Sequence, residues 1–416
     1  MKKIYLSEPG LICCAGRNKD ELYKSCITGN KSGMIIRELA AVGKFPTGQI
    51  PCREIPPVEL SGCGGSRVQP MAYTNASYTT GTRIIRIIDK ALEQMRPNIE
   101  KAIAEYGPEK IGVCLGSCDN GSEAYLLAHK EFFINGSFPK DYQLDFQSAS
   151  FPADYIAHKF GLKGPVFTVA TACASGASAI MRGAELIRSG YCCAVIAGGA
   201  DVVSETVLMG FHALEAVSNS PTNPLSKNRK GINLGEGAAF FLLDSKGAAA
   251  SQDGDIELLG AGESADAYHM TAPGPDGAGP AKAMKMAIME AKIDPSQIGY
   301  VNLHGTGTDL NDKAEAFALK AVFGETLPKV SSTKPIMGHT LGAAGALETA
   351  VCWMVLKEQK GLPVHCWDGE RDEEFPSLPV VSLSGVEQPA HEISICMTNN
   401  FGFGGCNVSL VLGRRS

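Results

Sequence analysis

The chain has 14 cysteines among its 416 residues but no Cys-x-x-Cys pair, the spacing typical of structural zinc sites and redox dithiols. This absence argues against both kinds of site and leaves most cysteines as free thiols, each expected to be a small apolar core residue. A strong charge of either sign is also missing, because 38 Lys and Arg face 44 Asp and Glu. The net charge of −6 provides no strong field toward nucleic acid or an anionic membrane.

Long apolar runs are scarce as well. The N-terminal segment reaches Glu8 and Pro9 after only a few apolar residues, too few for a secretory signal. The uncharged stretch 164–181 approaches the length of a membrane span, yet Thr, Ser, Gly and Pro interrupt it. We interpret it as a buried strand followed by a buried helix. The sequence therefore predicts a cytoplasmic protein with no membrane span.

Apolar strands alternate with amphipathic helices, which is typical of an α/β protein with buried sheets. The order of elements occurs twice. In the first half, a helix around 86–104 leads to an apolar strand. In the second half, a helix around 281–291 does the same. A strand then enters a helix of Gly, Ala and Ser at 169–184 and again at 331–347, which predicts corresponding places for Cys173 and His339. This repetition favours a duplicated fold over chance similarity, and its small residues allow neighbouring backbones to approach closely.

The break between the halves falls near 245–255, where polar and small residues interrupt the strands. It divides the chain into an N-terminal half, 1–248, and a C-terminal half, 249–416. The break is short, and no flexible linker is recognisable. We expect the two halves to form one compact unit.

Cys173 is the candidate nucleophile. It lies in Thr-Val-Ala-Thr-Ala-Cys-Ala-Ser-Gly-Ala, where a β-branched run gives way to helix-forming residues. This pattern predicts a strand-to-helix elbow. The positive end of the helix dipole is expected to lower the pKa of the thiol. Backbone N–H groups at the turn can stabilise an oxyanion when a thioester carbonyl is attacked.

Two histidines occur in glycine-rich settings. His304 begins the sequence His-Gly-Thr-Gly-Thr after the predicted strand 300–303, and its hydroxyl-bearing neighbours can hold a polar substrate arm. His339 is expected at a helix start, where the dipole keeps the imidazole neutral. A lone histidine in such a turn is as often structural as catalytic. Two neutral imidazoles near one thiol, however, suit a thioester condensation.

Three further sequence features are candidates for the same site: a lysine, a glutamate and an aromatic segment. Lys334 precedes His339 by five residues, and Glu315 lies on a helix that begins after Asn311 and Asp312. The two are predicted to form a buried ion pair, with a solvated lysine as the alternative. The segment 399–405, Asn-Asn-Phe-Gly-Phe-Gly-Gly, follows the predicted strand 392–397. It is expected to be a flexible turn that carries two aromatic side chains.

These motifs, in this order, resemble those of the elongating β-ketoacyl-acyl-carrier-protein synthases, within the thiolase-like superfamily. The matching segments are 171–176, 266–273, 304–308, 334–340 and 399–405, and the resemblance covers nearly the whole chain. It implies a duplicated five-layer αβαβα fold and an acyltransferase of fatty acid biosynthesis. Degradative thiolases have a second active cysteine and initiating synthases pair His with Asn, whereas this chain matches the Cys-His-His set.

The resemblance also implies roles for the residues of the reaction. Cys173 would take the acyl chain from an acyl-carrier-protein thioester. His304 and His339 would support decarboxylation of the malonyl thioester and stabilise the enolate oxygen, while Lys334 and Glu315 would balance the charge of the site.

The resemblance also implies which backbone N–H groups and side chains contact the substrate. The amides of Cys173 and Phe401 would form the oxyanion hole, and Phe401 would also gate the acyl pocket. Thr306 and Thr308 would bind the pantetheine arm. Thr271 and Phe403 are further candidate substrate-binding residues.

Partners are likewise implied by the resemblance alone. We expect acyl and malonyl thioesters as substrates and an acyl-carrier protein that brings its own phosphopantetheine. No cofactor or metal is expected to be bound, and no nucleic acid. The expected assembly is a homodimer, with a heterodimer with a related synthase as the alternative.

Two departures from the family pattern bear on the pathway in which the protein acts. Asp309 follows His-Gly-Thr-Gly-Thr where many relatives have Pro, and 223–237 lacks the usual Arg-Pro-Phe-Asp opening. Two alternatives therefore accompany fatty acid synthesis: a ketosynthase of a specialised aryl-polyene or polyketide pathway, and a non-catalytic chain-length partner subunit. The presence of Cys173 argues against the last.

Overall fold

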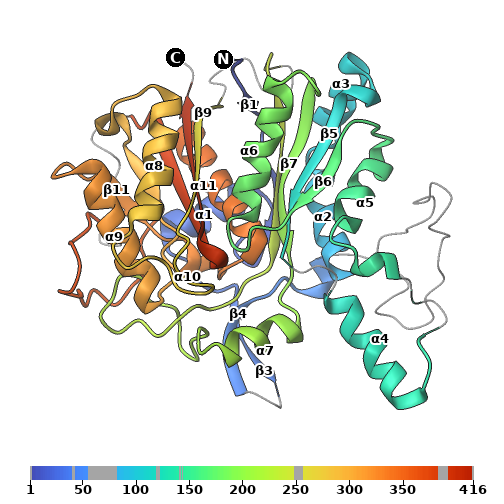
Figure 1. Ribbon diagram of the computed structural model, residues 1–416, viewed down its shortest axis with the longest axis horizontal. Coiled ribbons are helices and arrows are strands. Elements are labelled where there is room, and N and C mark those ends of the chain that lie inside the picture. Colours follow the sequence, from blue (N-terminus) through green and yellow to red (C-terminus); the bar gives the residue numbers. More distant parts are fainter. Residues whose placement is uncertain are drawn as a thin grey trace.

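The computed structural model describes residues 2–39, 43–54, 82–118, 122–139, 142, 144–247, 256–382 and 392–414. None of the helices in these ranges combines the length and apolar character needed to cross a membrane. The two ends of the described chain lie close together at the top of the molecule (Figure 1).

The described strands, apart from one small ribbon, form an eleven-stranded sheet. The first half contributes β2 (Gly10–Cys13), β5 (Ile111–Gly116), β6 (Val166–Val169), β7 (Ala194–Asp201) and β8 (Gly237–Asp244). The second half contributes β9 (Ile256–Ala265), β10 (Tyr300–Asn302), β11 (Lys329–Ser331), β12 (Ile395–Gly402) and β13 (Cys406–Arg414). The strand β1 (Tyr5–Leu6) joins the halves by pairing antiparallel with β8 and β9. The separate ribbon pairs β3 (Met34–Leu39) with β4 (Gly43–Gly48).

Each half has the same strand topology. The first is ordered β6-β5-β7-β8-β2 and the second β11-β10-β12-β13-β9. In both, the second, third and fourth strands of the half are parallel, and the fifth is antiparallel to its neighbours. The repetition predicted from the sequence is therefore present as a repeated topology. The division at residues 248 and 249 lies outside the described residues and stays a prediction.

Helices occupy three layers around the two half-sheets. The middle layer holds α6 (Ser175–Arg188) and α11 (Ala344–Glu358), which lie between the half-sheets in Figure 1. One outer layer holds α2 (Arg83–Glu93), α3 (Arg96–Tyr106) and α5 (Phe151–Phe160), and the other holds α8 (Ala278–Ala291) and α9 (Asp309–Phe323). Three large apolar clusters, one per helical layer, fill the spaces between helices and strands. This arrangement confirms the predicted αβαβα fold.

The remaining helices are α1 (Lys19–Thr28), α4 (Ser122–Asn135), α7 (Glu205–Ala213) and α10 (Lys334–Met337). Short 3-10 turns cover Cys52–Glu54, Pro108–Lys110, Leu144–Gln147, Pro295–Gln297, Leu341–Ala343 and Phe403–Gly405.

Some local predictions need correction. The helix expected at 86–104 is two helices, α2 and α3, because the chain turns at Gln94 and Met95 just before Pro97. The stretch 164–181 does contain a strand and a buried helix, but all four residues of β6 are partly exposed, because β6 is an edge strand. The strand expected to end at 397 extends to Gly402.

The two middle helices touch through glycines. A Cβ on Gly345 would lie 2.6 Å from the backbone nitrogen of Ala177, and one on Gly176 would lie 2.9 Å from the backbone nitrogen of Ala346. No side chain larger than hydrogen fits at either contact. This confirms the close approach that the small-residue helices predict.

We therefore expect Gly345→Ala to lower the free energy of unfolding by about 1–3 kcal/mol, because the added methyl group overpacks this contact. Gly210→Ala, in α7 with open space around its Cβ, is the matched control and is expected to stabilise by about 1 kcal/mol. Chemical denaturation of both variants measures the difference. An unchanged midpoint for Gly345→Ala would contradict the proposed contact.

Candidate active site

Three chain segments bring the predicted thiol and imidazoles together. Cys173 follows β6, His304 follows β10, and His339 follows β11. The Cys173 sulfur and one ring nitrogen of each histidine lie within 4.8 Å of one another, and all three side chains are buried. Cys173 and His339 each follow the third strand of their half, so the duplication itself places them at equivalent positions.

Cys173 is presented by a strained turn. The preceding residue, Ala172, has a φ of 49°, which is left-handed and unfavourable for a residue with a side chain. Ser175 holds the turn, because its hydroxyl accepts the N–H of Thr171 at 2.9 Å and donates to the carbonyl of Ala172 at 2.6 Å. Gly402 packs against it, and a Cβ there would approach the Thr171 oxygen to 2.8 Å. The predicted elbow is therefore present immediately before α6.

The acidity of the thiol differs from the prediction. Burial raises the pKa of Cys173 to about 11, although the charge of Lys334 and a hydrogen bond from the backbone N–H of Phe403 oppose the increase. The expectation of a lowered pKa is therefore wrong, because loss of hydration outweighs the favourable charges. At neutral pH the resting group is a thiol.

Both histidines are neutral and present an Nε2–H group. The backbone N–H of Leu341 donates to Nδ1 of His339 at 3.1 Å. The Nζ of Lys334 lies 3.4 Å from Nδ1 of His304, and an ammonium group can only donate. Burial, with a contribution from Lys334, lowers the pKa of both imidazoles. Each Nδ1 therefore accepts, which assigns the ring proton to Nε2.

The acid paired with Lys334 is Glu348, on α11. Lys334 Nζ lies 2.5 Å from Glu348 Oε1, and both side chains are buried. The predicted pair with Glu315 is wrong, although burial of Lys334 is confirmed. Glu348 was missed, yet it is the only charged residue between positions 340 and 356. An isolated acid in an otherwise uncharged buried helix is a signal that could have identified it.

Glu315 orients the turn that carries His304. Its carboxylate accepts the backbone N–H groups of His304 at 2.9 Å and Gly305 at 2.8 Å, and the side-chain amide of Asn399 at 3.2 Å. Burial raises the pKa of Glu315 to about 7 against these hydrogen bonds. Glu315 therefore acts on the backbone of the site rather than on Lys334.

The aromatic segment also differs from the prediction. Asn399 to Gly402 belong to β12 rather than to a flexible turn, and the ring of Phe401 lies 5.9 Å from that of His304. The amide that reaches the Cys173 sulfur is that of Phe403. The backbone amide beside Cys173 is therefore that of Phe403, and not that of Phe401 as expected. The Phe403 ring stacks against Phe211 of α7 at 5.7 Å.

A cavity of about 440 Å³ leads to the three reactive groups. Its walls include the predicted substrate-binding residues Thr271, Thr306, Thr308 and Phe403, as well as Phe401. The hydroxyls of Thr306 and Thr308 lie 2.9 Å apart. Such a cavity, with mainly apolar walls and a few hydroxyl groups, leads to a buried thiol and suits a long, narrow substrate arm.

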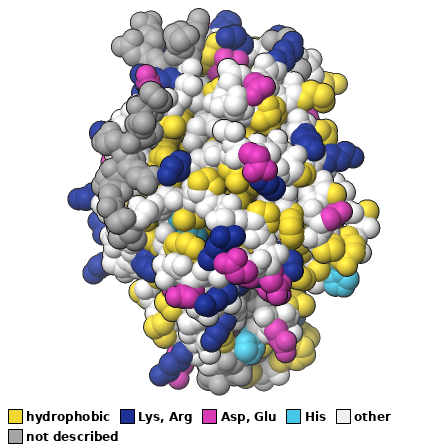
Figure 2. Space-filling view, turned by 90° about the vertical axis from the view of Figure 1, so that its left-hand side faces the viewer, with side chains coloured by type: hydrophobic (Ala, Val, Ile, Leu, Met, Phe, Trp, Pro, Cys, Tyr) yellow, Lys and Arg dark blue, Asp and Glu magenta, His cyan; other side chains and the backbone are white. Residues whose placement is uncertain are grey.

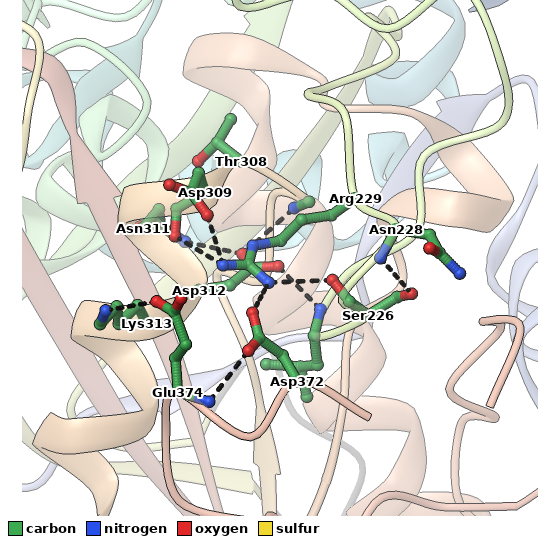
Figure 3. Close-up of polar contacts among 12 residues, drawn as sticks. Ser226, Asn228, Arg229, Thr308, Asp309, Asn311, Asp312, Lys313, Asp372 and Glu374 are labelled. Atoms are coloured by element: carbon green, nitrogen blue, oxygen red, sulfur yellow. Dashed lines mark hydrogen bonds and ion pairs between the residues drawn. The ribbon is translucent and has the colours of Figure 1, made fainter. Parts of the chain in front are cut away.

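The two unusual sequence segments meet at Arg229 and Asp309 (Figure 3), and both residues line the cavity. Arg229, from the 223–237 segment, donates to Asp309 Oδ1 at 2.6 Å and to Asp372 Oδ2 at 2.5 Å. Its guanidinium also lies 5.2 Å above the ring of Phe375. Asp309 thus supplies an ion-pair partner that proline cannot provide. Through Arg229, it links the turn after Thr308 to the 223–237 segment and to Asp372.

Metal binding is disfavoured by the surroundings of this cluster. A thiol and two imidazoles at this spacing could ligate an ion such as zinc. Both Nδ1 atoms, however, already accept hydrogen bonds, and the Lys334 ammonium adjoins His304. A cation would have to displace the Nε2 protons and lie near another positive charge.

Fold and site together define an α/β protein in which a buried thiol and two neutral imidazoles share one cavity. Residues 84–249 match the family model described as "Beta-ketoacyl synthase, N-terminal domain", and residues 256–366 match "Beta-ketoacyl synthase, C-terminal domain". The chain belongs to the beta-ketoacyl synthase family, and it is therefore an acyltransferase of the ketosynthase class.

Individual relatives agree. The chain is 36% identical to 3-oxoacyl-[acyl-carrier-protein] synthase 2 of Vibrio cholerae, over 75% of this chain and 78% of the relative. It is 32% identical to the Staphylococcus aureus synthase of the same name, over 79% and 82%. A ketosynthase from Xenorhabdus doucetiae, solved with its chain length factor, is 34% identical with a TM-score of 0.85, covering 100% of this chain and 98% of that one.

The identity of the acid that pairs with Lys334 is testable by a double-mutant cycle. Glu348→Leu alone is expected to cost about 3–5 kcal/mol of unfolding free energy, because it leaves a buried charge without a partner. Adding Lys334→Met should restore most of that loss. As control, Lys334→Met and Glu315→Gln should be additive within about 0.5 kcal/mol. Coupling to Glu315 instead of Glu348 would refute the assignment.

The raised thiol pKa predicts a pH profile. Alkylation of Cys173 by iodoacetamide should accelerate about tenfold per pH unit from pH 7 to 9, because the thiolate fraction rises while the pH stays below the pKa. Lys334→Met removes the nearby positive charge and should slow the reaction at each pH. Mass spectrometry of the Cys173 peptide measures the rate. A plateau near pH 7 would show that the thiol is already ionised there.

Proposed function

We propose that this chain catalyses decarboxylative Claisen condensation of an acyl thioester with malonyl-acyl-carrier protein through an acyl-Cys173 intermediate. The observation that carries the proposal is the convergence of the Cys173 thiol with two Nε2–H donors, from His304 and His339, in one cavity. Covalent capture separates acyl delivery from carbon–carbon bond formation, so each step has its reactants positioned in advance.

In the first half-reaction, the Cys173 sulfur attacks the acyl thioester carbonyl. Its backbone N–H and that of Phe403 stabilise the oxyanion. The carrier thiolate leaves and takes up the proton that Cys173 gives up, so the products are acyl-Cys173 and a free carrier thiol. A raised thiol pKa is compatible with this step, because the proton transfers as the new bond forms.

In the second half-reaction, the Nε2–H groups of His304 and His339 donate to the malonyl thioester oxygen. Charge accumulates on this oxygen as carbon dioxide leaves, and the two donors stabilise the enolate. The enolate carbon attacks the acyl-Cys173 carbonyl, and the sulfur leaves and is reprotonated from solvent. The 3-oxoacyl chain stays on the carrier.

Within this mechanism, Thr306, Thr308 and Thr271 bind the substrate arm. Lys334 and Glu315 act as positioning residues, the first through Nδ1 of His304 and the second through its backbone. The arm is phosphopantetheine attached to the carrier protein, and the proposal requires no metal or bound organic cofactor.

For assembly, we propose a dimer of two ketosynthase-like chains. The edge strand β6 is apolar except for Thr168, and all four of its residues are partly exposed, which suits pairing with a second chain. The exposed Phe133 and Ile134 of α4 provide further apolar surface. For the fatty-acid-synthesis hypothesis, the proposed dimer consists of two copies of this chain.

A second candidate function follows from the Xenorhabdus relative, which was solved with its chain length factor. It favours a ketosynthase of a specialised pathway that pairs with a non-catalytic related chain. The complete Cys-His-His set makes the catalytic role the one that fits this chain in such a pair. Elongation assays with acyl-carrier thioesters of different length and unsaturation would separate primary from specialised synthesis.

Incubation with an acyl-carrier thioester is expected to add the mass of one acyl group to the wild-type chain and none to Cys173→Ala. Cys118→Ala is the matched control and should be acylated normally, since this nearby thiol does not line the cavity. Intact-protein mass spectrometry reads the result. Acylation of Cys173→Ala would overturn the assigned nucleophile.

The same variant separates the two half-reactions. Cys173→Ala should still release carbon dioxide from malonyl-acyl-carrier protein, because both imidazoles are retained, whereas His339→Ala should lose about 2.7–4 kcal/mol of transition-state stabilisation, or 10²–10³-fold in rate. If Cys173→Ala and His339→Ala lost decarboxylation equally, the proposed division of roles would be wrong.

A further inference from the structure

Asp201 is a buried acid to which the proposed mechanism assigns no role. It is the last residue of β7 and is 0% exposed. On the face of the molecule that carries α9, by contrast, acidic side chains lie at the surface beside basic ones (Figure 2). A buried carboxylate loses its hydration, so the donors that replace water determine its position. The donors around Asp201 therefore indicate what it holds in place.

The carboxylate of Asp201 binds both halves of the chain. Its Oδ1 accepts the hydroxyl of Ser117 at 2.9 Å, and the backbone N–H of Cys118 lies 3.1 Å from Oδ1 and 2.9 Å from Oδ2. Oδ2 also accepts the backbone N–H of Gly342 at 2.5 Å. Ser117 and Cys118 follow β5, in the first half, whereas Gly342 belongs to the turn after His339, in the second. One side chain therefore joins the two halves beside the reactive groups.

The hydrogen bond to Gly342 acts on His339 through Leu341. Leu341 has a φ of 54°, a left-handed conformation that is unfavourable for leucine. Its own N–H donates to Nδ1 of His339 at 3.1 Å, and the N–H of the next peptide unit is the one that Asp201 accepts. Because the two peptide units meet at the Leu341 Cα, fixing one helps to fix the other. Asp201 thereby stabilises the strained turn that orients the imidazole and keeps its proton on Nε2.

The remaining hydrogen bonds attach Asp201 to the strands that lead to Cys173. Gly116, at the end of β5, pairs with Val169, at the end of β6. The N–H of Ser117 donates to the carbonyl of Val169 at 3.2 Å, and the elbow that carries Cys173 follows β6 directly. Asp201 therefore holds the His339 turn against the same strands that present the thiol.

The duplicated fold provides an independent comparison. The strand of the second half that is equivalent to β7 is β12, and its last residue is Gly402. Gly402 packs against the elbow before Cys173, where an added Cβ would lie 3.1 Å from the Cys173 nitrogen. The end of each equivalent strand thus contacts the reactive turn of the other half. At β12 this contact is main-chain packing, whereas at β7 it is a carboxylate, which a substitution can remove.

We infer that Asp201 is a positioning residue, which sets the location of the His339 imidazole relative to the Cys173 thiol. The inference rests on the proposed function, in which the enolate stabilised by His339 must reach acyl-Cys173. A misplacement of about 1 Å at such a step costs about 10²-fold in rate. Asp201 acts only through the backbone, because it does not line the cavity.

Hydrogen bonding, and not charge, is the property that this role requires. Because the N–H of Cys118 lies near both carboxylate oxygens, an asparagine oxygen can accept from Cys118 and Gly342 while its amide donates to the Ser117 hydroxyl. Asp201→Asn therefore keeps the connection between the turns, and Asp201→Ala removes it.

The test compares these two variants in the full chain. Release of carbon dioxide from malonyl-acyl-carrier protein measures the half-reaction that uses His339, and acylation of Cys173 by an acyl-carrier thioester measures the one that does not. Asp201→Ala is expected to lower kcat for carbon dioxide release about 10- to 100-fold, with KM and acylation like wild type. Asp201→Asn should retain both activities.

The matched control is Asp244→Ala. Asp244 is also a buried acid that accepts two backbone N–H groups, those of Lys246 and Gly247, but it lies opposite Ala194, at the other end of β7. This control should retain both activities. If Asp201→Ala does not fold, Asp201→Ser takes its place with the same expectation, because one hydroxyl cannot span both turns.

Three results would overturn the inference. The first is normal carbon dioxide release by the folded Ala or Ser variant. The second is an equal loss of both half-reactions, which indicates a general structural role. The third is a defect in Asp201→Asn as large as that of Asp201→Ala.

A measurement without substrate separates the inference from its premise. In protein with ¹⁵N-labelled histidine, the His339 signals, identified with His339→Gln, should show the Nε2–H form in wild type and a mixture of both neutral tautomers in Asp201→Ala. If wild type released no carbon dioxide but these signals changed as expected, the proposed function would fail and the positioning role would stand. Unchanged His339 signals in Asp201→Ala would refute the role of Asp201 whatever the activity.

Discussion

The buried charge of Lys334 is the constraint around which the site is organised. Its ammonium is compensated by Glu348 and donates toward Nδ1 of His304. The same charge helps to lower the pKa of both imidazoles and opposes the rise in the pKa of Cys173. One cation thus favours neutral histidines, which can donate to an enolate, and a more acidic thiol. Removing Glu348 alone would leave this charge unsupported in a medium that solvates it poorly.

The sequence contained enough information for the class of fold and for the reactive trio. The change from β-branched to small helix-forming residues located the Cys173 elbow, and glycine-rich turns after apolar strands located His304 and His339. These signals are local, because each depends on residues within one strand and the following turn. The repeated order of elements also predicted that Cys173 and His339 are equivalent in topology.

Other features depended on long-range packing that no local pattern specifies. Glu348 is fourteen residues from Lys334 along the chain, and Glu315 had an equally plausible charge. Only the orientation of α11 decides between the two acids. The Phe403 amide reaches Cys173 because β12 continues to Gly402, which moves the turn two residues beyond Phe401. The thiol pKa was mispredicted because burial is a property of the folded chain, whereas the helix dipole can be anticipated from the sequence.

The glycine contacts between α6 and α11 have a consequence for how the family varies. The helix that follows Cys173 and the helix that follows His339 touch through main-chain atoms, so their spacing is set by atomic radii rather than by the choice of side chains. Outer-layer residues can then be exchanged without moving the reactive groups apart. This chain is 34% identical to its Xenorhabdus relative and superposes on it with a TM-score of 0.85, as expected where main-chain contact, and not the choice of side chains, sets the distance between the two middle helices.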